Sequence, residues 1–127
     1  MISDRDIKKA KLFNYTCFSI VVLLWIIVLV FICVYRAKHT FSENIWKEDI
    51  ESRSLMVSDL QNKYSLVGMT QDQITDLLGP PNNDLGYFTQ EDRYVYCLGS
   101  ARSLIDREWL VIDFHNGIVS NVHMNID

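Results

Sequence analysis

The residues best suited to chemistry in this sequence are one aspartate and two histidines near its C-terminal end. Asp113 and His115 lie two positions apart in a β-rich run, so they share one face of a predicted strand. His123 falls on the strand that follows. Such residues can hold a metal ion weakly, or can pair a histidine base with the carboxylate that orients it. No third ligand is placed by the pattern, and exposed strand histidines are usually solvated, so we predict neither site.

The nucleophilic side chains lack the surroundings that catalysis needs. Ser100, Ser103 and Ser120 do not stand in a nucleophile-elbow motif. Cys97 has no CxxC or Cys/His metal spacing around it, and we interpret it as a small apolar residue on a buried strand face. A glycine-rich phosphate loop is also absent from the sequence. We therefore predict that the protein is not an enzyme and that it carries no cofactor.

The element that precedes all of these residues is one long apolar segment. No residue between Lys11 and Arg36 is charged. About 20 helical residues cross a hydrocarbon core of roughly 30 Å. We therefore predict a single transmembrane helix over residues 15–35, with Tyr15 and Tyr35 at the two interfaces.

A cleaved signal peptide is the nearest alternative to an anchor. Its apolar region is shorter, and it ends in a small-x-small cleavage site, which the run FICVYRAK does not contain. A lipoprotein signal needs small residues before its cysteine, whereas Cys33 follows Phe31 and Ile32. The sequence therefore favours an uncleaved anchor.

The basic residues predict the orientation of that anchor. Four precede the span and two follow it closely: Arg5, Lys8, Lys9 and Lys11, then Arg36 and Lys38. Cytoplasmic flanks are enriched in Lys and Arg. We predict a cytoplasmic N-terminal segment over residues 1–14 and an extracytoplasmic C-terminal domain, held at the cytoplasmic (inner) membrane.

The C-terminal part is acidic. From residue 36 onward the chain has 8 Lys and Arg against 14 Asp and Glu, a net charge of −6 with His neutral. Nucleic acids and anionic lipid head groups attract the opposite sign of charge. The expected partner is therefore another envelope or secreted protein, with homo-oligomerisation left open.

Residues 36–47 form the predicted connector, and residues 48–127 form the predicted domain. Apolar residues at helical spacing predict a first helix over residues 48–63. A second helix begins at Thr70, which with Gln73 makes a capping box, and it ends at Gly79 before two prolines. We expect both helices to pack on one face of a sheet.

The sequence pattern predicts three strands for that sheet, over residues 93–98, 108–114 and 118–124. A hairpin at Asn116-Gly117 allows two registers. The two-residue loop pairs Phe114 with Val119. We prefer the three-residue loop, which pairs Phe114 with Ile118, because it keeps one face apolar; it also pairs Ile112 with Ser120 and Leu110 with Val122. The predicted fold class is α+β: one transmembrane helix, then two helices on a three-stranded antiparallel sheet.

The predicted binding site is the sheet face turned away from the helices. We expect Val95, Cys97, Leu110, Ile112 and Phe114 to face the helices. The residues expected on the open face, as partner-binding residues, are Tyr94, Tyr96, Trp109, Val111 and His123. Tyr and Trp supply many interface hot spots. The alternative is that the connector helix or a dimer mate covers this face.

Three segments of the chain resemble the SmpA/OmlA (BamE-like) family: GMTQDQITDLLGPP, YVYCLG and WLVIDFHNGIVSNV. The positions that match the family pattern are Gly68, Leu77-Leu78-Gly79, Pro81, Phe114, Gly117 and Val119. The resemblance implies a β-lactamase-inhibitor-like fold and an envelope domain that binds proteins and catalyses nothing. BamE-like members hang from a lipid on an N-terminal cysteine, whereas this chain keeps a spanning helix, so an anchor in the cytoplasmic membrane fits it better.

Two functions follow from this sequence. The first is a membrane-anchored, non-catalytic scaffold or assembly factor that binds proteins in the cell envelope. The alternative is an immunity-type antagonist that binds and neutralises a toxin at the membrane, its acidic surface speeding the capture of a basic partner. The same fold and anchor serve both.

Overall fold

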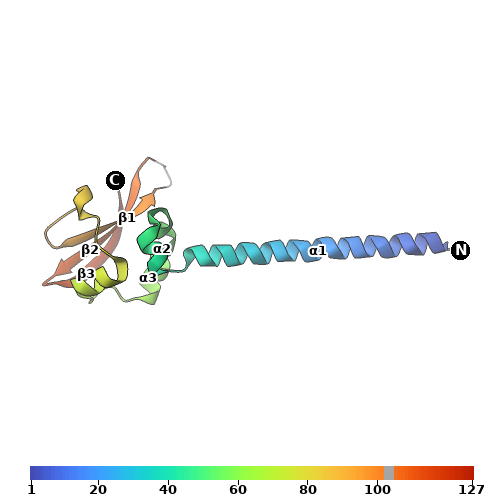
Figure 1. Cartoon of the computed structure of the whole chain (residues 1–127), viewed down its shortest axis with the longest axis horizontal. Coiled ribbons are helices and arrows are strands. Elements are labelled where there is room, and N and C mark those ends of the chain that lie inside the picture. Colours follow the sequence, from blue (N-terminus) through green and yellow to red (C-terminus); the bar gives the residue numbers. More distant parts are fainter. Residues whose placement is uncertain (102–104) are drawn as a thin grey trace. The chain divides into compact units, whose positions relative to one another are not determined.

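The computed structural model describes residues 1–101 and 105–127, and the Ser103 considered above lies outside them. The chain divides into two compact units, Met1–Ala37 and Lys38–Asp127. Figure 1 shows the long N-terminal helix and the small α+β unit that contains all three strands. Each unit is described by itself below.

The first unit is helical throughout its apolar region. Helix α1 runs over Asp4–His39 and has 36 residues. Asp4 and Asp6 in its first turn interact favourably with the positive end of the helix dipole. The most apolar stretch of 18 residues in this helix has a mean hydropathy of 3.3, and none of these residues is buried. The helix is therefore long and apolar enough to cross a membrane. It extends past the predicted span into the predicted connector.

The predicted helix over residues 48–63 consists of a 3₁₀ turn followed by one helix, and a further short helix precedes it in the predicted connector. Helix α2 covers Glu43–Glu48, a 3₁₀ turn (η1) covers Ile50–Ser52, and helix α3 covers Arg53–Lys63. Asp49 causes the break: its backbone is extended, and its carboxylate accepts the Glu51 N–H (3.2 Å) at the start of the next turn. The predicted start is wrong and the predicted end at Lys63 is confirmed.

The predicted connector contributes to the core of the domain. Phe41 and Trp46 are buried, with ring centroids 5.8 Å apart. The Phe41 N–H donates to a carboxylate oxygen of Asp59 on α3 (2.7 Å), which holds the segment against that helix. The folded domain therefore includes residues that the sequence pattern assigned to a linker.

The short capped helix forms as predicted. Helix α4 runs over Gln71–Leu78. Thr70 Oγ1 accepts the Gln73 N–H (3.3 Å), and Gln73 Oε1 accepts the Thr70 N–H (2.9 Å), which completes the capping box. The apolar side of the helix is buried, and Gly79 ends it with a positive φ of 80°. This local motif fixes where the helix lies in the chain.

The sheet has three antiparallel strands in the order β1-β2-β3. Their bounds are β1 Arg93–Ser100, β2 Arg107–His115 and β3 Ile118–Ile126. A short 3₁₀ helix, η2, over Asn83–Leu85 precedes β1. The predicted α+β class is confirmed, with a few short helices beside the sheet.

The hairpin register differs from the prediction. Phe114 pairs with Val119 around a two-residue loop, because Asn116 (φ 52°) and Gly117 (φ 76°) both adopt the left-handed backbone that such a turn requires. A bulge at Ser120 then shifts the pairing, so that Ile112 lies opposite Val122. The three-residue loop is therefore wrong, yet the bulge keeps apolar residues opposite each other.

Candidate functional site

The predicted binding face is assembled differently in the structure. Tyr94 pairs with Ile112 and Tyr96 pairs with Leu110, and directly opposed residues share a sheet face. Both tyrosines therefore belong to the core beneath the helices. The expectation that they point away from the helices is wrong. The run Tyr-Val-Tyr-Cys is apolar on both faces, so its alternation does not tell which face meets the helices.

Tyr96 ties the sheet to the end of helix α4. Its ring is fully buried, and its hydroxyl donates to the carbonyl oxygen of Gly79 (2.9 Å). Burial raises the pKa of Tyr96 well above the usual value for a tyrosine, because a phenolate in this position would lose its hydration. Tyr96 is thus a neutral hydrogen-bond donor inside the core.

The opposite sheet face is also closed. The smaller core on this side consists of Val95, Cys97, Trp109 and Val111, with Phe88 packed against it. The expectation that Val95 and Cys97 face the helices is therefore wrong, whereas the burial expected for Cys97 is confirmed. Trp109 and Val111 are 0% exposed, so their predicted exposure is wrong too.

The cover over this face comes from the segment before β1. Tyr87 stacks on Trp109, with ring centroids 5.1 Å apart, and Phe88 packs beside them. Phe88 has a positive φ of 54°, a backbone conformation that is costly for an aromatic residue. Neither the connector helix nor a second copy is needed to bury Trp109.

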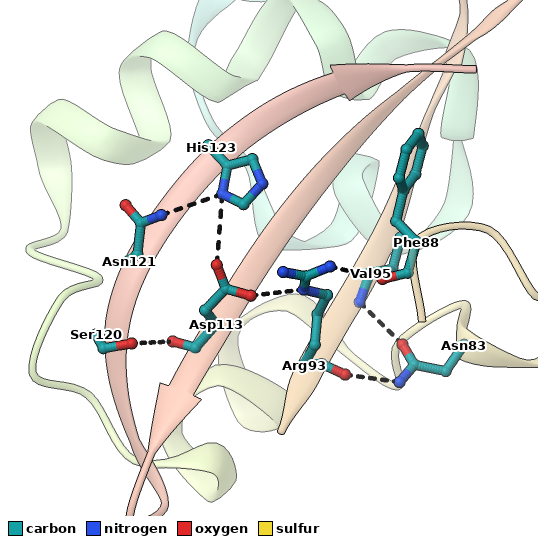
Figure 2. A network of polar contacts seen from close by, with 8 residues as sticks. All are labelled: Asn83, Phe88, Arg93, Val95, Asp113, Ser120, Asn121 and His123. Atoms are coloured by element: carbon teal, nitrogen blue, oxygen red, sulfur yellow. Dashed lines mark hydrogen bonds and ion pairs between the residues drawn. The ribbon is translucent and has the colours of Figure 1, made fainter. Parts of the chain in front are cut away.

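A polar network lies on the same face, nearer the hairpin (Figure 2). Arg93 Nε donates to one oxygen of Asp113, and His123 Nδ1 lies 3.6 Å from the other oxygen. Asn121 Nδ2 is 3.3 Å from the same imidazole nitrogen. The Arg93 guanidinium also donates to the Phe88 carbonyl oxygen (3.1 Å), so the network holds the covering segment in place.

This network contains Asp113 and His123, two of the three residues that the sequence singled out, whereas His115 is exposed at the end of β2. His123 lies on the strand after Asp113, as expected, but the nearest cation to Asp113 is Arg93. Over residues 1–101 and 105–127, no group of three or more His, Cys, Asp and Glu side chains is arranged to hold a metal ion. The arrangement supports a structural ion pair on the sheet.

Sequence reasoning missed Arg53, the one buried charged residue in the described part of the chain. Its Nε donates to the carbonyl oxygen of Trp46 (2.6 Å), and its Nη1 donates to the carbonyl oxygen of Cys97 (3.0 Å) and to the side-chain oxygen of Asn82 (3.3 Å). Its guanidinium also lies 5.3 Å from the centre of the Trp46 ring. Desolvation lowers the pKa of Arg53.

Through these contacts Arg53 connects α3, to which it belongs, with α2, with β1 and with the turn before η2. Removing it would leave two backbone carbonyl groups without their donors. The sequence signal was its spacing: Arg53 lies three and four positions before Met56 and Val57, and therefore on the apolar face of the predicted helix.

Two depressions lie on the helical side of the domain, around Tyr64. One of about 330 Å³ is lined by apolar, acidic and amide side chains: Glu43, Tyr64, Met69, Gln73, Asp76 and Leu77. A second one of about 320 Å³ shares Glu43 and Tyr64 and is lined also by Phe41, Ser42 and Asn44. We call these two adjoining depressions the Tyr64 surface.

Charged groups of both signs stand at the edge of the Tyr64 surface. The Lys47 ammonium donates to the main-chain oxygen of Asp76 (3.1 Å) and lies 3.9 Å from the Glu43 carboxylate. The Asp76 carboxylate itself is exposed and makes no ion pair among the described residues. The first depression thus offers the apolar side chains of Met69 and Leu77 beside an available negative charge, whereas the lining of the second is mostly polar.

No protein-family model and no curated protein matches this chain.

Proposed function

We propose that this chain is a single-pass, membrane-anchored module of the cell envelope that binds another protein and is non-catalytic. The observation that carries the proposal is the Tyr64 surface, whose first depression places the side chains of Met69 and Leu77 beside the Asp76 carboxylate. A partner segment that presents apolar side chains next to a Lys or Arg fits it. The resemblance to SmpA/OmlA domains, whose members bind envelope proteins, points the same way.

The anchor and its orientation belong to this proposal. The uncharged run spans residues 12–35, all within helix α1, and is longer than the apolar region of a signal peptide. Four basic residues before the run and two shortly after it favour a cytoplasmic N-terminus. A reporter that is active only outside the cytoplasm, fused after Asp127, should therefore be active. Activity of a cytoplasm-only reporter at the same position would contradict this orientation.

Site-specific photo-crosslinking tests the Tyr64 surface in the full chain. A photoreactive amino acid at Gln73, an exposed residue lining this surface, should yield an adduct with a partner protein in intact cells. The matched control is the same replacement at Gln90, which is also exposed and belongs to the segment that covers the opposite sheet face. Asp76→Lys should reduce the Gln73 adduct, because it reverses the charge offered to the partner. Equal adducts at Gln73 and Gln90 would contradict the proposed site.

The acidic character of the domain favours a second candidate, the immunity-type antagonist. A net charge of −6 from residue 36 onward would speed the encounter with a basic toxin. The two functions differ in a protection assay: an antagonist should rescue growth when it is co-expressed with a toxin encoded beside it, and a scaffold should not. Asp76→Lys should weaken that rescue if the toxin uses the Tyr64 surface.

A further inference from the structure

The free edge of β1 is covered by the turn before it. The Asn82 N–H donates to the carbonyl oxygen of Val95 (2.7 Å), and the side-chain oxygen of Asn82 accepts the Cys97 N–H (3.0 Å). The side-chain oxygen of Asn83 accepts the Val95 N–H (2.9 Å). These contacts occupy the backbone groups that another strand would use.

Among the residues that the structure describes, the free edge of β3 is covered at its start alone. The Gly68 N–H donates to the carbonyl oxygen of Val119 (2.9 Å), and the Val119 N–H donates to the carbonyl oxygen of Met69 (2.8 Å). Within the described ranges, the backbone of residues 120–126 pairs with β2 and with no other segment. This part of the strand can accept a further strand.

The open part of β3 lacks the usual protection of an edge strand. Residues 121–125 contain no Lys, Arg, Asp, Glu or Pro, the residues that commonly prevent strands from pairing at an edge. The bulge at Ser120 lies before this segment and does not interrupt it. A strand placed here would meet neither a charged side chain nor a missing N–H group on β3.

The sequence of this segment is nearly symmetric about His123. It reads Asn-Val-His-Met-Asn, with an amide residue at each end and an apolar residue on each side of the histidine. In an antiparallel pair of two such segments centred on His123, Asn121 lies opposite Asn125 and Val122 lies opposite Met124. Polar residues then face polar residues, and apolar residues face apolar residues.

We propose that the open edge of β3 binds a second copy of this chain, forming a two-fold dimer with a continuous six-stranded sheet. Such an interface is isologous, since the same residues act on both sides. It does not depend on the partner proposed for the Tyr64 surface.

An apolar depression supports this choice of occupant. Val122 lines a depression of about 250 Å³ together with Leu66 and Val67. Met124 shares the face of Val122, because their opposed residues on β2 both belong to the core beneath the helices, and it is 56% exposed. In the dimer, Met124 of the second copy lies opposite Val122 and covers this depression.

The charge distribution also favours a second copy. Among the described residues, the carboxylate in contact with this segment is that of Asp113, beside His123, and it is already paired with Arg93. A basic partner strand would find no available carboxylate in this described part of the edge. Two neutral edges can meet without opposing like charges, even though each domain is acidic.

Engineered disulfides test the pairing and its register in the full chain. Cys17 and Cys33 are first replaced by Ser, and the buried Cys97 is kept. His123→Cys should give a disulfide-linked dimer on mild oxidation, because the two residues 123 face each other within disulfide reach. Asn125→Cys alone should give about tenfold less disulfide-linked dimer. In the dimer the two residues 125 are displaced from each other by four positions along the strands, roughly 13 Å. An equal mixture of Asn121→Cys and Asn125→Cys should cross-link again.

A second measurement uses no oxidation. Light scattering in detergent should give the mass of a dimer for the original chain and of a monomer for His123→Glu, which places two carboxylates opposite each other. Unchanged thermal melting of each variant shows that the domain is still folded. A monomeric original chain, a dimeric His123→Glu variant, or equal cross-linking at positions 123 and 125 would each overturn the proposal.

Discussion

The ring of Tyr87 stacks on the indole of Trp109, with centroids 5.1 Å apart and an interplanar angle of 29°. Tyr87 is itself half-exposed, whereas Trp109 is fully buried. The indole N–H of Trp109 has no hydrogen-bond partner among the described residues. The segment before β1 therefore supplies the second wall of a small core, on the sheet face that the sequence suggested was open.

Replacing Trp109 by Ala should destabilise the domain strongly. A buried Trp that is truncated to Ala leaves a cavity and costs roughly 3–5 kcal/mol of unfolding free energy. Urea unfolding followed by circular dichroism measures this loss. Tyr87→Ala is the control: it removes the half-exposed ring of the stacked pair and should cost clearly less. Equal stability of Trp109→Ala and the original chain would show that the segment does not cover the face.

The parts of the fold that the sequence predicted are those specified by neighbouring residues. Thr70, Gln73 and Gly79 define both ends of α4 within ten positions, and the structure has the capping box that they encode. The strands were located for the same reason. The break at Asp49 was missed, because apolar residues continue at helical spacing across it.

The candidate site was harder to predict, because burial depends on contacts between distant segments. The cover of Trp109 by Tyr87 joins positions that no periodic pattern relates. The same holds for Arg53, whose acceptors come from α2, β1 and the turn at Asn82. A strand that is apolar on both faces can be oriented in two ways, and only the packed structure distinguishes them.

Tyr96 should make the domain less stable in alkali. The pKa of Tyr96 is raised in the folded state, whereas in the unfolded chain it returns to about 10. The stability it contributes is therefore complete below about pH 10 and is lost as the pH rises from there toward the folded-state pKa, by up to about 1.4 kcal/mol per pH unit. Unfolding free energies measured between about pH 9 and about pH 11, roughly one unit on each side of that value, should show this slope.

Tyr96→Phe should remove the contribution of this residue to the alkaline slope. It should also cost about 1 kcal/mol at neutral pH, because the Gly79 carbonyl oxygen loses its donor. Tyr87→Phe is the matched control, since that residue is half-exposed. An unchanged slope in Tyr96→Phe would contradict the burial of the hydroxyl.

Arg53→Met should destabilise the domain by roughly 3 kcal/mol, because two buried carbonyl groups lose a charged donor. Arg53→Lys should recover only part of this, since one ammonium group cannot reproduce the fork of donors. The comparison is with Asn62→Met, at an exposed position of the same helix. Equilibrium unfolding of the three variants distinguishes a buried connecting residue from a surface residue: equal losses for Arg53→Met and Asn62→Met would contradict the assigned role.

The N-terminal boundary of the folded domain should lie before Phe41. A fragment over residues 38–127 keeps Phe41 and Trp46, which are both buried in the core beneath the helices. A fragment over residues 48–127, the boundary that the sequence pattern suggested, lacks both rings, and losing one large buried side chain already costs roughly 3–5 kcal/mol. Total stabilities of small domains are about 5–15 kcal/mol, so the shorter fragment should be largely unfolded. Circular dichroism melts of the two fragments measure this: a cooperative transition is expected for 38–127 alone, and the same transition in 48–127 would show that the two rings are dispensable.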